Sequence, residues 1–183
     1  MNMNNQKVVK EIFVENPDIH WQYANVEGKR VLDLGCGDFG NATTLTYPST
    51  VEYFLERQAS FVVGVGVSAV DAENLKNKID INKIKVLSMP IEDSSQIVDL
   101  IIQNNIDVVK CDIEGFETAL FDVPIDTFRT VEEYYVETHG NDLHNRCIEK
   151  LTECGYDIYA EINLGQTNHH PEGSCKVLFA RRN

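Results

Sequence analysis

The chain has 183 residues, of which 43% are hydrophobic, and its 29 Asp and Glu exceed its 16 Lys and Arg to give a formal net charge of -13. This charge disfavours a nucleic-acid partner, because a polyanion would be repelled and few basic groups are present to displace its counterions. The five cysteines form no CxxC pair, so we expect free thiols. No apolar stretch is long enough for a signal peptide or a membrane span, so we expect no membrane partner and a cytoplasmic location.

The N-terminal part of the chain is expected to cover a core that begins at Lys29. An amphipathic helix is predicted over residues 5–15 and should end at Asn16 and Pro17. The core opens with the run Val-Leu-Asp-Leu at residues 31–34, which is followed by glycines and predicts a first buried strand. Residues 1–28 are therefore interpreted as a helical cover and residues 29–183 as the core.

Strand-like and helix-like segments alternate through the middle of the chain. The strand-like segments are residues 61–67, 85–89 and 106–113, and the helix-like segments are residues 68–79 and 94–104. This alternation predicts right-handed crossovers and a parallel sheet with helices on both faces. The expected fold class is therefore α/β.

The last third of the chain departs from this alternation. A strand over residues 134–138 is followed by a helix over residues 143–154, in which apolar side chains recur every fourth residue until Gly155. Two further strand-like runs, residues 156–163 and 175–181, have no helix between them and should pair antiparallel at the sheet edge. No repeat or linker marks a boundary, so we expect a single domain.

The most informative segment is the glycine-rich turn after the first strand, Asp33-Leu34-Gly35-Cys36-Gly37-Asp38-Phe39-Gly40. Glycines lack a Cβ and let the backbone approach a ligand closely at the carboxyl end of a sheet. The same spacing matches the dinucleotide-binding fingerprint, and a glycine turn can also be purely structural. Asp33 favours a third interpretation, because a carboxylate there repels a pyrophosphate and attracts the ammonium and sulfonium groups of S-adenosylmethionine.

Two motifs together resemble those of known methyltransferases. Residues 31–37, Val-Leu-Asp-Leu-Gly-Cys-Gly, are similar to motif I of the Rossmann-like S-adenosylmethionine-dependent methyltransferases. Residues 110–117, Lys-Cys-Asp-Ile-Glu-Gly-Phe-Glu, are similar to the DIEG-E signature of the FkbM family. The resemblance runs from Arg30 to the C-terminus and implies a Rossmann-like methyltransferase fold, with a mostly parallel seven-stranded sheet that ends in an antiparallel hairpin. It also implies O-methylation of a small-molecule or carbohydrate hydroxyl.

The resemblance further implies which residues bind the methyl donor. The methionine part would be held at the glycine turn by Asp33, Gly35, Cys36 and Gly37. Asp93, which follows the third strand, resembles the residue that binds adenine, while Asp is also favoured as the N-cap of a following helix, and the two roles are compatible. Asp112 and Glu114 would face both donor and acceptor, with a solvated turn carboxylate as the alternative for Glu114.

The sequence departs from the family pattern at two places. Relatives usually carry an acidic residue at the end of the second strand to bind the ribose hydroxyls, but Gly66 occupies that position in this chain. Ser68 is the candidate replacement, with Asp71 as the alternative. The helix after motif I is also delayed, because residues 41–49 are Thr-rich and contain a proline, so that helix-forming sequence resumes only at Thr50. This longer loop either shapes the acceptor pocket or is a simple insertion.

Polar residues gather where the fifth strand ends. His139 is a candidate general base for the acceptor hydroxyl, since an ordinary histidine pKa near 6.5 suits that task at neutral pH. Glu137, His139 and His144, with or without Asp112, form an alternative divalent-metal site, and the plainest alternative is a pair of polar loop histidines. We assign no metal ligand from the sequence, and the catalytic candidates are, in order, Asp112, Glu114 and His139.

Methyl transfer is therefore the favoured function, in which the protein mainly holds the acceptor oxygen, methyl carbon and sulfur collinear. One rival is a nicotinamide-dependent oxidoreductase, disfavoured by Asp33, by Gly66 and by the lack of a Tyr-x-x-x-Lys pair. The other rival is an inactive donor-binding module that acts as an interaction partner. Acceptor specificity is expected to lie in the N-terminal cover and in the loops at residues 41–49 and 164–174, and the sequence leaves the oligomeric state open.

Overall fold

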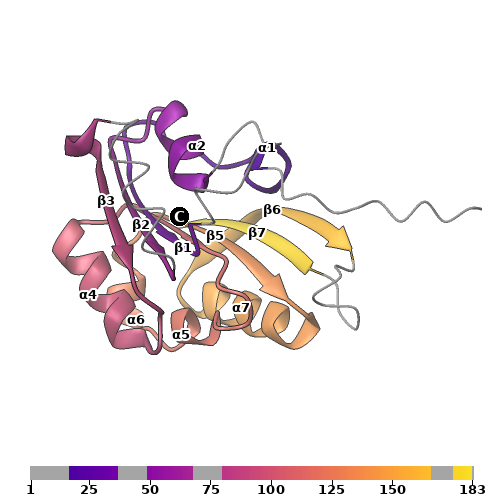
Figure 1. Ribbon diagram of the computed structural model, residues 1–183. Coiled ribbons are helices and arrows are strands. Elements are labelled where there is room, and N and C mark those ends of the chain that lie inside the picture. Colours follow the sequence, from indigo (N-terminus) through magenta and orange to yellow (C-terminus); the bar gives the residue numbers. More distant parts are fainter. Residues whose placement is uncertain (1–16, 37–48, 68–79, 166–174, 183) are drawn as a thin grey trace, which may run out of the picture.

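The computed structural model describes residues 17–36, 49–67, 80–165 and 175–182, and its centre is a seven-stranded sheet (Figure 1). The strand order across the sheet is β3-β2-β1-β4-β5-β7-β6. All neighbours pair in parallel except β7, which is antiparallel to both β5 and β6. The strands are β1 (Arg30–Leu34), β2 (Phe61–Gly66), β3 (Ile84–Ser88), β4 (Val108–Cys111), β5 (Glu133–His139), β6 (Tyr156–Gly165) and β7 (Cys175–Arg182).

Helices cover both faces of this sheet (Figure 1). On one face lie α1 (Pro17–His20) and α2 (Thr50–Glu56). The other face carries α4 (Ser94–Asn104), α5 (Thr118–Phe121), α6 (Ile125–Phe128) and α7 (Asn141–Glu153). A short 3-10 turn, η1 (Ile81–Lys83), precedes β3. Within the described ranges, no helix has both the length and the apolar character that a membrane crossing requires.

The core has two layers because side chains alternate between the two faces of each strand. In β1, Leu32 and Leu34 belong to the layer beneath α4 to α7, whereas Val31 belongs to the layer beneath α1 and α2. Trp21, just after α1, is only 2% exposed and lies in that second layer. Asp33 shares the face of Val31, so the carboxylate of motif I points into the layer beneath α1 and α2.

The structure confirms the α/β fold class, the seven-stranded sheet, the helices on both faces and the antiparallel C-terminal hairpin. The helix expected over residues 94–104 is α4, with the same ends. The strand expected over residues 106–113 is shorter, because Glu114 (φ 53°) and Gly115 (φ 95°) turn the chain soon after β4. The helices expected over residues 5–15 and 68–79 lie outside the described residues, as does nearly all of the two specificity loops.

Three short helices were not anticipated from the sequence. Pro17 was expected to end a helix, but it lies in α1, whose described residues are Pro17–His20. Helices α5 and α6 have four residues each, which is too short for a helical period to appear in the sequence. Together α5 and α6 carry the chain from β4 to β5.

Candidate active site

The glycine turn after β1 is wedged between its two neighbouring strands. The amides of Gly35 and Cys36 both donate to the carbonyl of Val65 in β2, at 2.9 and 3.1 Å. Gly35 has φ 74°, and a Cβ placed there would lie 1.6 Å from the backbone oxygen of Asp112, just after β4. Only glycine fits this position, because any other residue would meet both the strained backbone and that carbonyl. Cys36 is buried, and Gly37 lies outside the described residues.

Asp33 is fully buried and is paired with a lysine from the neighbouring strand. The β1–β4 register places Asp33 directly beside Lys110, whose Nζ lies 3.1 Å from Oδ1 of Asp33. The hydroxyl of Thr50, at the start of α2, donates to the other carboxylate oxygen of Asp33. Lys110 is also fully buried, and its ammonium lies 5.2 Å from the ring centre of Trp21.

Lys110 also ties this pair to the glycine turn. Its ammonium donates to the carbonyl oxygens of Leu34 and Gly35, and it lies 3.9 Å from Asp112. Burial by itself lowers the pKa of Lys110, but the carboxylates of Asp33 and Asp112 outweigh this effect, and the net shift is upward. The lysine therefore stays charged and balances Asp33 inside the protein. The sequence led us to expect that Asp33 attracts the sulfonium of the donor. Because Lys110 balances the charge of Asp33, the other carboxylates of the site contribute to this attraction as well.

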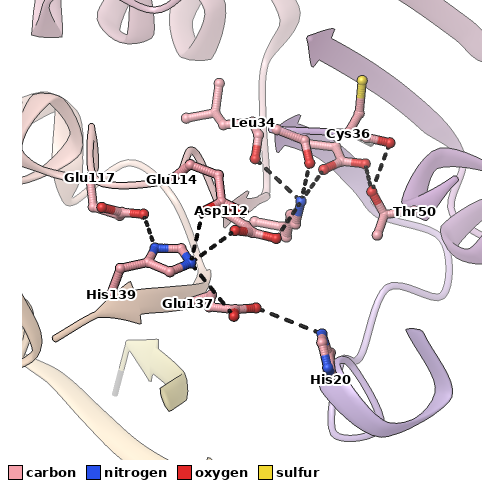
Figure 2. Close-up of polar contacts among 12 residues, drawn as sticks. His20, Leu34, Cys36, Thr50, Asp112, Glu114, Glu117, Glu137 and His139 are labelled. Atoms are coloured by element: carbon pink, nitrogen blue, oxygen red, sulfur yellow. Dashed lines mark hydrogen bonds and ion pairs between the residues drawn. The ribbon is translucent and has the colours of Figure 1, made fainter. Parts of the chain in front are cut away.

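A second group of charged side chains surrounds His139 at the end of β5. Figure 2 shows this group beside the glycine turn. We call it the His139 cluster, and its members are Asp112, Glu114, Glu117, Glu137 and His139. The Nδ1 atom of His139 lies 2.7 Å from a carboxylate oxygen of Glu117, a fully buried residue just before α5. The Nε2 atom faces three further carboxylates at 3.7 to 3.8 Å, those of Asp112, Glu114 and Glu137.

The protonation of His139 differs from the sequence-based expectation. Burial lowers the pKa of this histidine, but the hydrogen bond and charge of Glu117, together with Asp112 and Glu137, raise it to about 9. His139 is therefore an imidazolium cation at neutral pH, whereas the argument for a general base assumed the ordinary pKa near 6.5. Its most direct contribution is the positive charge and the N–H donor that it presents to the carboxylates.

The members of the His139 cluster differ in access to solvent. Glu117 is completely buried and also accepts a hydrogen bond of 3.2 Å from the amide of Gly115. The side chain of Asp112 is 11% exposed, whereas that of Glu114 is 64% exposed. Glu114 is therefore both a solvent-facing turn carboxylate and a neighbour of His139. The cluster is closed on the inside by Glu117 and open to an incoming molecule at Glu114.

Two predicted residues lie in other surroundings. The ring of His144, on α7, lies 3.2 Å from the hydroxyl of Thr138 and 3.6 Å from Glu161, so the expected grouping of Glu137, His139 and His144 retains only its first two members as close neighbours. Asp93 is the N-cap of α4, where its side chain accepts hydrogen bonds from the amides of Ser95 and Gln96. These bonds, together with the Ser95 hydroxyl, lower the pKa of Asp93.

The ribose position also has a local explanation. A Cβ at Gly66, where relatives carry the acidic residue, would lie 3.3 Å from Sγ of Cys36, a tight contact. Ser68 and Asp71, the candidate replacements, lie outside the described residues.

Sequence reasoning missed four residues of this site: Lys110, Glu117, Thr50 and His20. Lys110 left a signal, because a lysine within the run Val-Val-Lys-Cys of a buried strand requires an internal partner. Glu117 was noticed as part of the FkbM signature without a role. His20 left no signal, since only the tertiary fold brings its ring to 3.7 Å from Glu137.

The site as a whole carries excess negative charge. Two cations, Lys110 and the His139 imidazolium, face the five carboxylates Asp33, Asp112, Glu114, Glu117 and Glu137. His20 adds no positive charge at neutral pH, because burial and the charge of Lys110 lower its pKa to about 4. Such a site attracts a cation and repels a diphosphate.

Comparisons with known proteins agree with this architecture. A family model described as "Methyltransferase FkbM domain" matches residues 3–158. Among curated protein sequences, none matches the chain.

Solved structures share the fold at low sequence identity. The tRNA methyltransferase TrmK of B. subtilis is 15% identical with a TM-score of 0.61, over 94% of this chain and 68% of that protein. A Streptococcus pneumoniae protein thought to be a tRNA methyltransferase, in complex with S-adenosyl-L-methionine, is 15% identical with a TM-score of 0.56, over 86% and 67%. A protein of the NADB-Rossmann superfamily from Streptococcus agalactiae is 16% identical with a TM-score of 0.59, over 88% of this chain and 65% of that protein. The chain thus spans about two thirds of the length of these neighbours.

Proposed function

This chain belongs to the FkbM methyltransferase family, and from that premise we propose that it transfers the methyl group of S-adenosylmethionine to a hydroxyl of a small molecule or carbohydrate. The observation that carries the proposal is the contact between Gly35 and the backbone of Asp112. It joins the turn that would hold the donor to the carboxylate that would face the acceptor. Donor and acceptor groups are thereby held next to one another before either molecule binds.

The donor side is formed by a turn that fits a ligand approaching the bare backbone. Gly35 has no room for a Cβ, and its amide and that of Cys36 are held against Val65. Asp33 acts as a positioning residue, because with Lys110 and Thr50 it fixes the turn and the start of α2. Asp93, at the exposed start of α4, is the proposed adenine contact. The bound donor supplies a methyl group on a positively charged sulfur, which the net negative charge of the site favours.

The acceptor side is formed by the carboxylates of Asp112 and Glu114 with the imidazolium of His139. The carboxylates accept hydrogen bonds from hydroxyls of the acceptor, and the imidazolium keeps these carboxylates charged and in place. The acceptor oxygen forms a bond to the methyl carbon as the carbon–sulfur bond breaks, and S-adenosylhomocysteine leaves with the electron pair on sulfur. Asp112 takes up the hydroxyl proton, since its side chain is 11% exposed and its backbone contacts the glycine turn.

The acidity of the protein supports a small or sugar-like acceptor over a nucleic acid. The chain carries a formal net charge of -13, and the described site adds more carboxylates than cations. A phosphodiester chain would be repelled both by the net charge of the protein and by the carboxylates of the site. The tRNA methyltransferases among the structural neighbours therefore provide the contrasting acceptor for a test.

The donor half of the proposal is tested by calorimetric titration with S-adenosylmethionine, S-adenosylhomocysteine and NAD. We expect both sulfur compounds to bind and NAD not to bind. Asp93→Ser separates the two roles of that residue, because serine keeps the helix cap but removes the carboxylate. Asp93→Ser should retain wild-type stability and bind S-adenosylmethionine about tenfold more weakly, whereas Asp93→Ala should lose in addition about 1 kcal/mol of stability. Wild-type donor affinity in both variants would remove Asp93 from the donor site.

The acceptor half is tested by transfer of a labelled methyl group to a panel of phenols, sugars, hydroxy acids and tRNA. Asp112→Asn should lose at least about a hundredfold in transfer rate, a much larger loss than its loss of donor affinity. Labelling of tRNA alone would refute the proposed acceptor class. Donor binding without any labelled product in the whole panel would support the inactive binding module instead.

A further inference from the structure

We propose that Asp112, Glu114 and His139 bind a divalent metal cation, and that this cation positions the hydroxyl of the acceptor. The inference rests on the proposed function, because the three residues are its acceptor-side candidates. It adds a cofactor and a substrate requirement: the acceptor must present an oxygen that can bind a metal.

The first observation is how closely the ligand atoms converge. One ligand atom from each of Asp112, Glu114 and His139 lies within 4.8 Å of the other two. The Nε2 atom of His139 is 3.8 Å from Asp112 and 3.7 Å from Glu114. These separations are too long for a hydrogen bond, which spans about 2.7 to 3.2 Å. In an octahedral site with bonds of about 2.1 Å neighbouring ligand atoms stand about 3.0 Å apart, so side-chain shifts of less than about 1 Å would suffice to hold a cation.

The second observation is how the histidine is held. Its Nδ1 atom is bound at 2.7 Å by Glu117, a fully buried carboxylate that itself accepts from the amide of Gly115. A histidine that binds a metal commonly uses its other ring nitrogen in this way, because the carboxylate fixes the ring orientation and strengthens the ligand nitrogen. Glu117 thus directs Nε2 of His139 towards Asp112 and Glu114 (Figure 2).

Charge and access favour this group over the other possible grouping around the same histidine. Glu137, His139 and Cys175 also converge, but Glu137 and Cys175 are both buried, so that grouping offers no place for an acceptor. Glu114 instead leaves its side open to solvent, with a 64% exposed side chain. Two carboxylates and an imidazole suit a cation such as Mn²⁺, which would displace the Nε2 proton of the His139 imidazolium when it binds. The excess of carboxylates in the His139 cluster stabilises a dipositive ion.

The cation would serve the same reaction. An acceptor hydroxyl bound to a divalent metal would have a lower pKa and would therefore give up its proton more readily, to the carboxylate oxygen of Asp112 that does not bind the cation, as its oxygen attacks the methyl carbon. Acceptors with a second oxygen beside the reacting hydroxyl, as in vicinal diols and catechols, would bind best because they can chelate the ion.

The test uses the full chain after treatment with EDTA and titrates Mn²⁺ alone, observed by electron paramagnetic resonance and calorimetry. We expect one Mn²⁺ per chain, and Glu114→Gln should weaken this binding at least tenfold. The exposure of Glu114 makes that variant safe for folding, and Glu149→Gln, on the exposed side of α7, is the matched control and should bind Mn²⁺ like wild type. His139→Gln provides a second variant that should also lose the metal.

The outcomes separate this inference from the proposed function. No Mn²⁺ binding, or equal affinity in wild type and Glu114→Gln, overturns the metal site. In parallel, S-adenosylmethionine is titrated into the EDTA-treated protein. If S-adenosylmethionine binds and Mn²⁺ does not, the proposed metal site is refuted and the proposed methyl transfer is not. Mn²⁺ bound as expected, without any binding of S-adenosylmethionine, supports the metal site and refutes the proposed donor.

Discussion

Replacing Lys110 by methionine should reveal how strongly the turn depends on a buried ion pair. Methionine keeps the length and approximate volume of lysine but removes the ammonium, which lies 3.1 Å from Asp33 and 3.9 Å from Asp112. The change leaves the fully buried carboxylate of Asp33 without a countercharge. Breaking a buried pair in this way costs about 3 to 5 kcal/mol, a large part of the roughly 5 to 15 kcal/mol that stabilises a typical domain.

The expected loss converts to a fall in melting temperature of about 10 °C for a protein of this size. It is measured by urea unfolding and thermal melting of wild type, Lys110→Met, and the double variant Asp33→Asn with Lys110→Met. The double variant should recover at least about 1 kcal/mol relative to Lys110→Met, because the unpaired charge is then removed as well. Lys83→Met, an exposed lysine in η1, is the control and should change stability by less than about 0.5 kcal/mol.

Two results would refute this reasoning. A loss below about 1 kcal/mol in Lys110→Met would mean that the pair contributes no more than a surface contact. A double variant no more stable than Lys110→Met would mean that Asp33 is not the group left without its countercharge.

Two further predictions concern the turn and the N-terminal cover. In urea unfolding, Gly35→Ala should destabilise the protein by at least about 2 kcal/mol more than Gly28→Ala. The two glycines have nearly the same φ (74° and 71°), but only at Gly35 would the new Cβ meet a backbone oxygen. Equal losses of stability in the two variants would show that the contact with Asp112 is unimportant. Stability should fall by about 2 kcal/mol between pH 7 and pH 5 through His20, because its pKa is about 4 in the folded protein and 6.5 in the unfolded chain, so that the unfolded state binds the proton first. His20→Gln should lack this part of the acid sensitivity, and identical pH profiles for wild type and variant would contradict a buried neutral His20.

Much of the architecture follows from local pattern. Alternating strand-like and helix-like segments predict a parallel α/β sheet, and the unbroken hairpin at the C-terminus predicts its antiparallel edge, as the structure confirms. The strand ends were less accurate, because a strand stops where its neighbours stop and not where its apolar run ends. The turn from Glu114 to Gly115, which shortens β4, is set by left-handed backbone conformations that no periodicity records.

The candidate site was only half visible in the sequence. Motif I and the FkbM signature identified Asp33, Gly35, Asp112 and Glu114, and the structure brings the first three together at one edge of the sheet. The motifs do not predict which charged residues form ion pairs. Lys110 and Asp33 are separated by most of the first half of the chain and meet only through the register of β1 and β4. The pKa of His139 is equally a tertiary property, because it depends on carboxylates from β5 and from the segment that follows β4.

The sequence by itself determined the fold class, the family and the glycine that the turn requires, because these depend on residue type and spacing along the chain. Only the tertiary structure decided that Asp33 is neutralised by Lys110, that Glu117 orients His139 and that His144 faces elsewhere. The physical reason is that electrostatic energies depend on distances of a few ångströms between groups far apart in the chain and on how much water remains between them. Both quantities exist only once the sheet has formed.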